Sequence, residues 1–198
     1  MKKILITGGG GDWAQSFKVQ YSDQFEVFTP GRHELDVTSP QMVANYLSDK
    51  TFDIVINNAG TIHPKRILES DEQLWIKDIE VNLIGVYLVA KHALAGNKDT
   101  CIINISSAAG FSAYADWSSY CASKAAVNTL TKSLASDGFS SYALCPGGFD
   151  TKFRNYFNLD NNNLMSCEKV SEYVMAIIAG DYNSGDVIFF RGQDVKIH

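Results

Sequence analysis

Short runs of consecutive apolar, largely β-branched residues recur along the chain and predict buried strands. Six such runs lie at 4–7, 25–28, 54–57, 101–105, 142–145 and 187–190. Strands that are apolar at successive positions are typical of a parallel sheet whose two faces are both covered by helices.

Longer segments between these runs carry helix-start signals. Ser39 is a good N-cap residue and Pro40 suits the first helical position. Ser70 and Gln73 have the spacing of a capping box, and Ser166 offers a cap for the last helix. We expect helices at about 14–21, 40–49, 71–95, 118–136 and 167–179. The alternation predicts an α/β fold: a doubly wound, Rossmann-type parallel sheet of about six strands with helices on both faces.

The length of the chain and its uniform composition predict one domain. Its 198 residues are near the usual domain size, and no repeat, low-complexity segment or linker interrupts them. We therefore expect residues 1–198 to form a single domain. No apolar run reaches the ~20 residues of a membrane span, and glycines end the apolar start after Ile6, so we expect a cytoplasmic protein.

Charge and cysteine usage exclude several classes of site. The net charge is −5 with Lys and Arg scattered, whereas a nucleic-acid binder normally shows a basic stripe. The cysteines show neither CxxC pairing nor metal-ligand spacing, and we expect buried thiols and no metal site. They are Cys101, Cys121, Cys145 and Cys167.

A glycine-rich turn follows the first predicted strand. Residues 7–14 read Thr-Gly-Gly-Gly-Gly-Asp-Trp-Ala and open the first predicted helix. Glycines there let a pyrophosphate approach the free N–H groups at a helix N-terminus. The alternative interpretation is a flexible surface loop, but the position between first strand and first helix favours a dinucleotide site.

Four further motifs follow this turn in order. They are Asn-Asn-Ala-Gly at 57–60, Asn-Ile-Ser-Ser at 104–107, Tyr-Cys-Ala-Ser-Lys at 120–124 and Cys-Pro-Gly at 145–147. In this order and spacing the chain resembles the short-chain dehydrogenase/reductase family, from Lys3 to about Gly192. The resemblance implies an NAD(P)-dependent oxidoreductase that interconverts a small-molecule carbonyl and alcohol.

The resemblance also implies a catalytic set. Ser107 lies thirteen residues before Tyr120, as the family's serine does, and Ser106 fits that spacing less well. Lys124 completes the tyrosine–lysine pair, and Asn82 resembles the family's asparagine in the long central helix. Ser107 would hold the substrate oxygen, and Asn82 would support a water chain toward Lys124.

The cofactor set combines the glycine turn with the resemblance. It comprises Thr7, Gly8, Gly11, Asp12, Trp13, Arg32, Asp36, Asn58, Ala59, Gly60, Tyr120, Lys124, Pro146, Gly147 and Thr151. The resemblance places the glycines at the phosphates, 58–60 at the adenosine and 146–151 at the nicotinamide carboxamide. Asp36 resembles an adenine-contacting aspartate, and a capping role beside Thr38 is the alternative.

The chemistry of the tyrosine can be argued from the residues alone. Transfer of hydride to a carbonyl needs a proton donor at the oxygen, and a tyrosine with pKa ~10 is a poor base in the reverse direction. Lys124 lies at i+4, on the same helix face, and a nearby cation lowers the pKa of a phenol. Without its neighbours, such a pair would be read as a solvated helix face. Tyr114 and Trp117 precede it and either line the substrate site or anchor their loop.

Two departures from the single-domain pattern affect the adenine end. Gly8, Gly11 and Ala14 have the spacing of the extended, sugar-nucleotide branch, and only seven residues separate Phe28 from Asp36. A helix and a strand are therefore expected to be missing there, as in the dTDP-4-dehydrorhamnose reductase group. Alternative functions are a nucleotide-sugar reductase or epimerase and a non-catalytic NAD(P)-sensing regulator.

Two further expectations concern cofactor choice and assembly. After the second strand no acid precedes Glu34, and Arg32 can bind a 2′-phosphate bidentately, so NADP is preferred over NAD; the alternative is that Arg32 solvates a turn. The 74–90 segment is apolar around more of its helix than one stripe needs. With the smooth helix after Tyr120, it predicts a homodimer or homotetramer.

Overall fold

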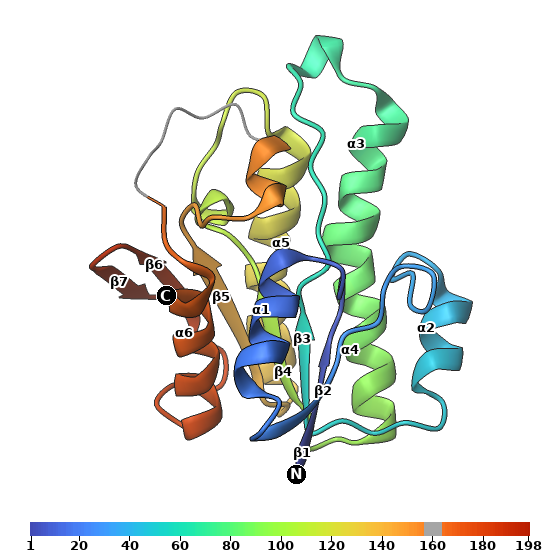
Figure 1. The fold of residues 1–198 in the computed structure, drawn as a ribbon. Helices are drawn as coiled ribbons and strands as arrows, with labels where there is room; N and C mark the ends of the chain where they lie inside the picture. Colours follow the sequence, from blue (N-terminus) through green and yellow to red (C-terminus); the bar gives the residue numbers. More distant parts are fainter. Residues whose placement is uncertain (157–163) are drawn as a thin grey trace.

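The computed structural model describes residues 1–156 and 164–198, and its centre is one seven-stranded sheet (Figure 1). The strand order is β2-β1-β3-β4-β5-β6-β7, parallel except for the antiparallel β6–β7 pair. The strands are β1 (Lys2–Ile6), β2 (Phe25–Phe28), β3 (Ile54–Asn57), β4 (Cys101–Ile105), β5 (Ser141–Pro146), β6 (Val187–Arg191) and β7 (Asp194–Ile197).

Helices cover both faces of the sheet (Figure 1). They are α1 (Asp12–Tyr21), α2 (Pro40–Leu47), α3 (Glu72–Ile79), α4 (Gly85–Gly96), α5 (Ser118–Ser136) and α6 (Cys167–Ala179). The π-helical segment η2 (Glu80–Ile84) joins α3 to α4, and short 3₁₀ segments are η1 (Ile67–Glu69), η3 (Ala108–Phe111) and η4 (Lys152–Tyr156). The doubly wound α/β fold predicted from the sequence is confirmed.

Successive side chains of each strand point to opposite faces of the sheet, and an apolar core lies on each face. Ile4 and Ile6 face the core beneath α1 and α6, whereas Leu5 faces the core beneath α2 and α4. Both sets are completely buried, which is why the strand sequences are apolar at consecutive positions.

The last strand was not predicted. β7 lies at one edge of the sheet and all four of its residues are exposed. Asp194 and Lys196 alternate with Val195 and Ile197, so the segment lacks the apolar run by which the other strands were found. The sheet therefore has seven strands rather than about six.

The other edge of the sheet matches the shortened connection. No helix or strand lies between β2 and α2 within the described residues, and β2 is the edge strand. The connecting segment instead buries Leu35 and Val37 against the α2–α4 side. A Cβ at Gly85 would lie 2.7 Å from Val37 Cγ2, so glycine at this point of α4 lets the connection pack closely.

One helical stretch, Glu72–Gly96, is long and apolar enough to meet the length and composition criteria of a membrane span. In its most apolar part, 44% is buried inside the protein, and α4 supplies Val89 and Leu94 to the core. A core helix of a globular domain passes the same test, and this packing accounts for the buried part of its apolar sequence.

Candidate active site

A cavity of about 480 Å³, the first cavity, lies at the carboxyl ends of β1, β3 and β4. Ligands of doubly wound sheets bind at this edge. Its lining includes most of the predicted cofactor residues: Gly8, Gly11, Asp12, Trp13, Arg32, Asp36, Asn58, Ala59, Gly60, Tyr120, Lys124 and Thr151. Sequence reasoning missed other lining residues, among them Gly10, Leu35, Val37, Thr61, Val81, Ile105, Ser106, Phe149, Lys152 and Phe153.

The glycine turn is shaped by close backbone approaches. Gly8 has φ +65°, and a Cβ there would lie 2.8 Å from Ala59 Cα. A Cβ at Gly9 would overlap the Thr29 carbonyl, whereas one at Gly10 would meet nothing within 4 Å. Gly11 is the N-cap of α1, so the free N–H groups of that helix begin beside the cavity. This cradle of small residues fits a dinucleotide pyrophosphate.

Thr7 and Asn58 fasten the turn to the end of β3. The Thr7 hydroxyl accepts hydrogen bonds from the Asn58 and Ala59 amides at 3.0 and 3.1 Å. The Asn58 side chain donates to the Thr7 carbonyl at 3.0 Å. Thr7, predicted to bind cofactor, is 1% exposed and does not line the cavity; it braces the two segments that do.

Arg32 and Asp36 form an ion pair at the far end of the first cavity, with Nε and Oδ2 3.0 Å apart. Partial burial acts to raise the pKa of Asp36. Hydrogen bonds from the Thr38 hydroxyl and amide, together with Arg32, outweigh burial and lower the pKa to about 2. Asp36 thus makes the capping contact at Thr38, and it also lines the first cavity, where contact with an adenine stays a prediction.

Asp12 and Trp13 link the cavity to the C-terminal half. The Asp12 carboxylate accepts a hydrogen bond from the Lys152 amide at 2.6 Å, so the start of α1 is tied to η4. Trp13 is 2% exposed and its indole donates to Ser171 in α6 at 3.2 Å. Trp13 is thus mainly a core residue that also presents an edge to the cavity.

Tyr120, Ser107 and Lys124 come together where α5 meets the end of β4. Tyr120 is 5% exposed and is hydrogen-bonded to Ser107. Lys124 Nζ donates to the Ile105 carbonyl at 2.8 Å and lies 5.5 Å from the centroid of the Tyr120 ring. Ser106 instead donates to the Lys124 carbonyl at 3.1 Å, which agrees with the choice of Ser107 as the serine that faces Tyr120.

Burial shifts both ionisable groups of the pair toward their neutral forms. It raises the pKa of Tyr120, against the hydrogen bond to Ser107, and it lowers the pKa of Lys124 to about 8. In the polypeptide alone, burial therefore outweighs any lowering of the tyrosine pKa by Lys124, and the expectation that Lys124 and the positive charge of an oxidised nicotinamide lower it together stays a prediction. The reason is geometric: the ammonium group lies over the ring and is bonded to a carbonyl, and the phenol is desolvated.

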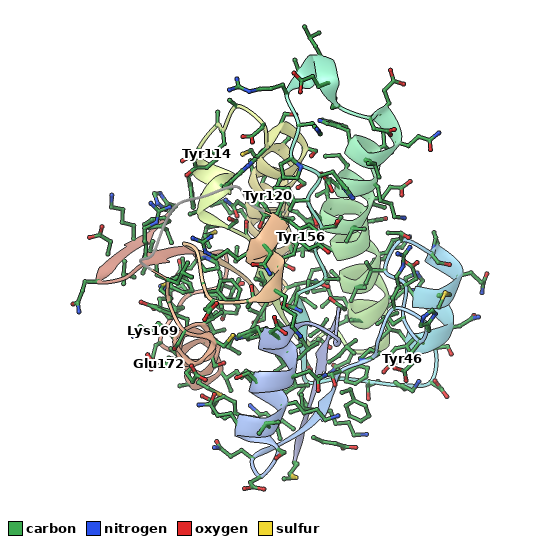
Figure 2. All side chains as sticks on the ribbon, turned by 45° about the horizontal axis from the view of Figure 1, so that its top comes forward. Tyr46, Tyr114, Tyr120, Tyr156, Lys169 and Glu172 are labelled. Carbon is green, nitrogen blue, oxygen red and sulfur yellow. The ribbon has the colours of Figure 1, made fainter. Side chains whose placement is uncertain are left out.

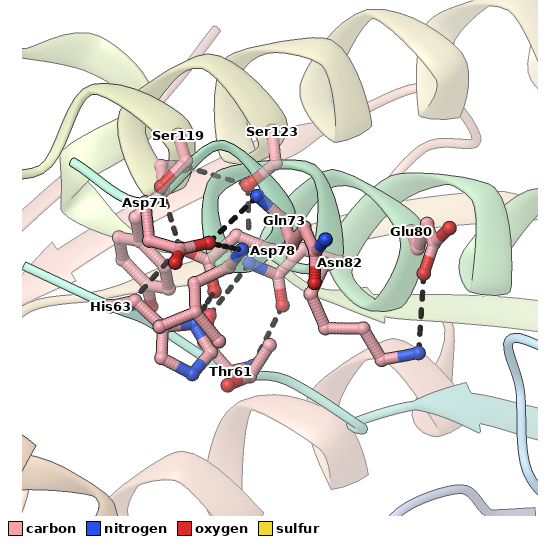
Figure 3. A network of polar contacts seen from close by, with 12 residues as sticks. Thr61, His63, Asp71, Gln73, Asp78, Glu80, Asn82, Ser119 and Ser123 are labelled. Atoms are coloured by element: carbon pink, nitrogen blue, oxygen red, sulfur yellow. Dashed lines mark hydrogen bonds and ion pairs between the residues drawn. The ribbon is translucent and has the colours of Figure 1, made fainter. Parts of the chain in front are cut away.

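Asn82 lies in the π-helical segment η2 and is completely buried (Figure 3). Its side-chain oxygen accepts from the Thr61 amide at 2.8 Å, and its nitrogen donates to the Thr61 carbonyl at 2.8 Å and to Ser123 at 3.2 Å. A Cβ at Gly60 would lie 3.5 Å from Asn82 Oδ1 and 4.0 Å from Lys124 Nζ. Asn82 thus holds the segment after Gly60 against α5, beside the lysine.

A second buried network was missed by sequence reasoning. Asp78, completely buried in α3, accepts hydrogen bonds from the His63 amide at 3.0 Å and from Ser119 at 2.5 Å (Figure 3). Its other oxygen lies 2.7 Å from His63 Nδ1. An aspartate within an apolar helix was the available signal, and its partners lie too far along the chain to be inferred. The network fixes the residue before Tyr120.

A smaller cavity of about 110 Å³, the second cavity, opens on the other side of Tyr120. Tyr114 and Trp117 line it, so they are more than loop anchors; Figure 2 marks Tyr114 near Tyr120. Ser107, Pro146 and Gly147 line this cavity and not the first, although the last two were predicted to bind cofactor. The cavities share Ser106, Tyr120, Phe149, Thr151 and Phe153 and therefore adjoin around these residues.

The four cysteines are unpaired thiols, of which Cys121 and Cys145 are buried. Burial raises the pKa of Cys145 to about 12. Among the described residues no group of His, Cys, Asp or Glu side chains is arranged to hold a metal ion. Among the residues that line both cavities, Tyr120 carries the ionisable side chain, and Lys124 lines the first cavity beside it.

Similarity to known proteins agrees with this arrangement. The short chain dehydrogenase family model matches residues 14–162. A benzil reductase ((S)-benzoin forming) of Bacillus cereus is 28% identical over 185 residues, covering 79% of this chain and 74% of that protein. A cis-4-hydroxycyclohexanecarboxylate dehydrogenase of Sinomonas cyclohexanicum is 37% identical over 129 residues, covering 59% and 52%.

Solved structures share the fold at low identity. A small-chain dehydrogenase in complex with NADPH superimposes with TM-score 0.86 at 20% identity, covering 96% of both chains. A 3-ketoacyl-(acyl-carrier-protein) reductase of Brucella melitensis complexed with NADH gives TM-score 0.88 at 19% identity and 97% coverage of both. The family match spans most of the chain, and the chain therefore belongs to the short-chain dehydrogenase/reductase family of NAD(P)-dependent oxidoreductases.

Proposed function

We propose that this oxidoreductase interconverts a small carbonyl compound and its alcohol, with Tyr120 as the acid and base. The observation that supports this most strongly is the meeting of the two cavities at Tyr120. One cavity has the glycine cradle of a dinucleotide site, and the other has the size of a small organic molecule. The phenol stands between them, within reach of both.

The first cavity has the shape and chemistry for NAD(P). The N–H groups of the first turn of α1 would hold the pyrophosphate, since those of Gly9 and Gly11 already donate to the Pro30 and Gly8 carbonyls. The Arg32–Asp36 end would hold the adenosine, and Tyr120, Lys124 and Thr151 would hold the nicotinamide end. When bound, the cofactor supplies or accepts the hydride at the substrate carbon. We propose NADP in preference to NAD because Arg32 lines this cavity.

The side chains around Tyr120 handle the proton. In reduction, Ser107 would donate a hydrogen bond to the carbonyl oxygen, and Tyr120 Oη would give that oxygen its proton. Burial lowers the pKa of Lys124 to about 8, so its ammonium group releases a proton readily. That proton can replace the one that the phenol has given up. Asn82 holds the backbone of residues 60–61 beside Lys124, where a water chain could reach it.

The Ser107, Tyr120 and Lys124 cluster also weighs against a purely sensory role. A regulator that only registers NAD(P) occupancy has no need of a buried proton donor beside a second cavity. A nucleotide-sugar enzyme would require room for a nucleotide at the substrate side, and the second cavity measures about 110 Å³. The glycine spacing that suggested this branch remains a prediction about ancestry.

Two relatives suggest different substrates. The enzyme from Bacillus cereus is named for a neutral aromatic diketone, and the one from Sinomonas cyclohexanicum for a cyclic alcohol that carries a carboxylate. The first name describes a ketone attached to a ring, and the second a secondary alcohol within a ring. We propose a ring-bearing carbonyl compound as the substrate of this chain.

We also propose that the enzyme acts in the cytoplasm as a homodimer or homotetramer. Leu74, Ile76, Ile84 and Tyr87 on the α3–α4 stretch are 44–52% exposed, more apolar surface than a solvated helix usually shows. Light scattering at micromolar concentration tests this, and a monomer would reject it.

The function is tested by cofactor binding followed by turnover. Thermal shifts with NADPH, NADP⁺, NADH and NAD⁺ are expected to show stabilisation by one pair, and the better reduced cofactor is then oxidised in the presence of ring-bearing ketones. Gly10→Val is the matched variant, because Gly10 lines the first cavity and a Cβ there would meet no atom within 4 Å. Absence of any cofactor-dependent shift in the wild type, or of turnover across the ketone panel, would overturn the proposal.

A further inference from the structure

Two arginines line the second cavity, although the protein is negatively charged overall. Arg154 and Arg191 both line it, and its described lining residues include no Asp or Glu. The net charge of the chain is −5, so two guanidinium groups beside the same small cavity are not a general property of the surface. A cavity lined in this way attracts anions.

Arg191 is the last residue of β6, and its side chain runs across the backbone of Gly147 at the end of β5. A Cβ at Gly147 would lie 2.9 Å from Arg191 Cγ and Nε. Glycine at 147 therefore leaves the space that the arginine stem occupies. The guanidinium carbon lies 6.0 Å from the centroid of the Phe189 ring, which supports its direction by a cation–π contact.

Arg191 is available to a ligand. None of the ion pairs among the described residues involves it, and it is exposed at the edge of the cavity. It lines the second cavity and not the first, so it is placed for the substrate side of Tyr120 and not for the cofactor phosphates.

The other lining residues of the second cavity indicate the chemistry of the rest of the ligand. Tyr114, Trp117 and Phe153 supply aromatic surface, with ring centroids of Tyr114 and Trp117 4.5 Å apart. Tyr120 and Ser107 supply the hydroxyl groups that would meet a carbonyl oxygen. A planar carboxylate matches the two parallel N–H groups of a guanidinium. The cavity thus presents an aromatic wall, an anion site and a carbonyl site within one small volume.

We propose that the substrate is a ring-bearing keto acid, or the corresponding hydroxy acid, whose carboxylate binds Arg191 while its carbonyl lies against Tyr120 and Ser107. This rests on the proposed function. In reduction, the carbonyl carbon gains a hydride from the reduced nicotinamide, which is oxidised, and the former carbonyl oxygen takes the proton of Tyr120. The carboxylate is unchanged in the reaction and serves recognition only.

The test compares an acid with its neutral ester. Benzoylformate and methyl benzoylformate are reduced by the wild type, by Arg191→Gln and by Lys196→Gln. Lys196→Gln is the matched control, because Lys196 lies on the exposed strand β7 outside the cavity and its substitution also removes one positive charge. In Arg191→Gln the ratio of kcat/KM for acid over ester is expected to fall about ten- to a hundredfold, mainly through KM for the acid. In Lys196→Gln the ratio is expected to stay as in the wild type.

The outcomes separate this proposal from the general function. Reduction of the ester by wild type and Arg191→Gln alike supports the carbonyl reaction, and an unchanged acid-to-ester ratio in the same experiment overturns the role of Arg191. Calorimetric titration with benzoate provides a readout besides turnover: binding to the wild type that weakens at least about tenfold in Arg191→Gln is expected. Equal benzoate affinity in the two proteins would likewise overturn the proposal.

Discussion

The two ends of the first cavity are built differently. At the adenosine end, the Arg32 side chain is 72% exposed and its ion pair with Asp36 faces solvent. At the catalytic end, Lys124 is 4% exposed, Asn82 is fully buried, and each makes hydrogen bonds to main-chain groups. Charge is thus solvated at one end and desolvated at the other.

This difference explains how each end can vary. An exposed ion pair contributes little to stability, so the Arg32–Asp36 pair can change at little cost. The short connection at this end still covers the core, because it buries Leu35 and Val37. Buried polar groups are costly unless they are paired, so the catalytic end must keep its whole set of partners. A substitution at the adenosine end is therefore expected to change cofactor affinity by a small amount. A substitution at the catalytic end is expected to change turnover or stability by a larger amount.

The largest effect is expected from Lys124→Met. Turnover should fall at least about a hundredfold because the proton of Tyr120 can no longer be replaced. The free energy of unfolding of the wild type, relative to that of the variant, should rise with pH, whereas a lysine in a surface ion pair would make it fall. Burial lowers the pKa of Lys124 to about 8, whereas the unfolded chain ionises near ~10.4.

Between those two pH values the unfolded wild type holds a proton that the folded protein has released, so its stability relative to the variant rises with pH. Urea unfolding of both proteins from pH 7 to pH 10 measures this difference. A difference that does not change over that range would mean that Lys124 is not desolvated.

Neighbouring glycines provide the next contrast, within the turn itself. Gly9→Ala would press a methyl group against the Thr29 carbonyl and should cost about 2–4 kcal/mol. Gly10→Ala meets no atom within 4 Å and should change the free energy of unfolding by no more than about 0.5 kcal/mol. Urea unfolding without cofactor compares them, and equal stabilities would refute the close approach of the turn to residue 29.

Two helical asparagines test the effect of burial on polar pairing. Asn82→Ala removes contacts to Thr61 and Ser123 and should destabilise by about 2–3 kcal/mol. Asn45 is exposed on α2, where it accepts a hydrogen bond from Gln41. Asn45→Ala should lie within about 0.5 kcal/mol of the wild type. Thermal unfolding monitored by circular dichroism gives both values, and similar losses would contradict the contrast.

The smallest effect is expected from Arg32→Ala. The exposed guanidinium should contribute roughly three- to tenfold to NADPH affinity and almost nothing to NADH affinity. Fluorescence titration of both cofactors with both proteins measures this. Equal wild-type affinities for the two cofactors, or an NADPH affinity untouched by the substitution, would remove Arg32 from the cofactor site.

The sequence predicted what depends on local patterns. Apolar runs located β1 to β6, cap residues located the starts of α2 and α6, and the spacing of Ser107, Tyr120 and Lys124 is realised as a contact cluster. The capping box expected at Ser70 is wrong, because Asp71 is the N-cap of α3. Features that depend on long-range burial were not predicted. The raised pKa of Tyr120 follows from desolvation, which no i+4 spacing reveals.

The same limit applies to partners that are distant in the chain. Asp78 and Ser119 are 41 residues apart, and their contact depends on the packing of α3 against α5. Arg191 reaches the second cavity only because Gly147, on the neighbouring strand, leaves room for its stem. Each residue looks unremarkable in sequence, and the sheet and helix packing gives each its place.

The central claim is that Tyr120 transfers the proton, and Tyr120→Phe tests it most directly. Single-turnover oxidation of bound NADPH or NADH by a ring-bearing ketone should slow by at least about a hundredfold, while the Kd of the cofactor stays within about twofold, because phenylalanine keeps the ring and removes only the acid. Oxidation of the cofactor at a rate comparable to that of the wild type would contradict the account.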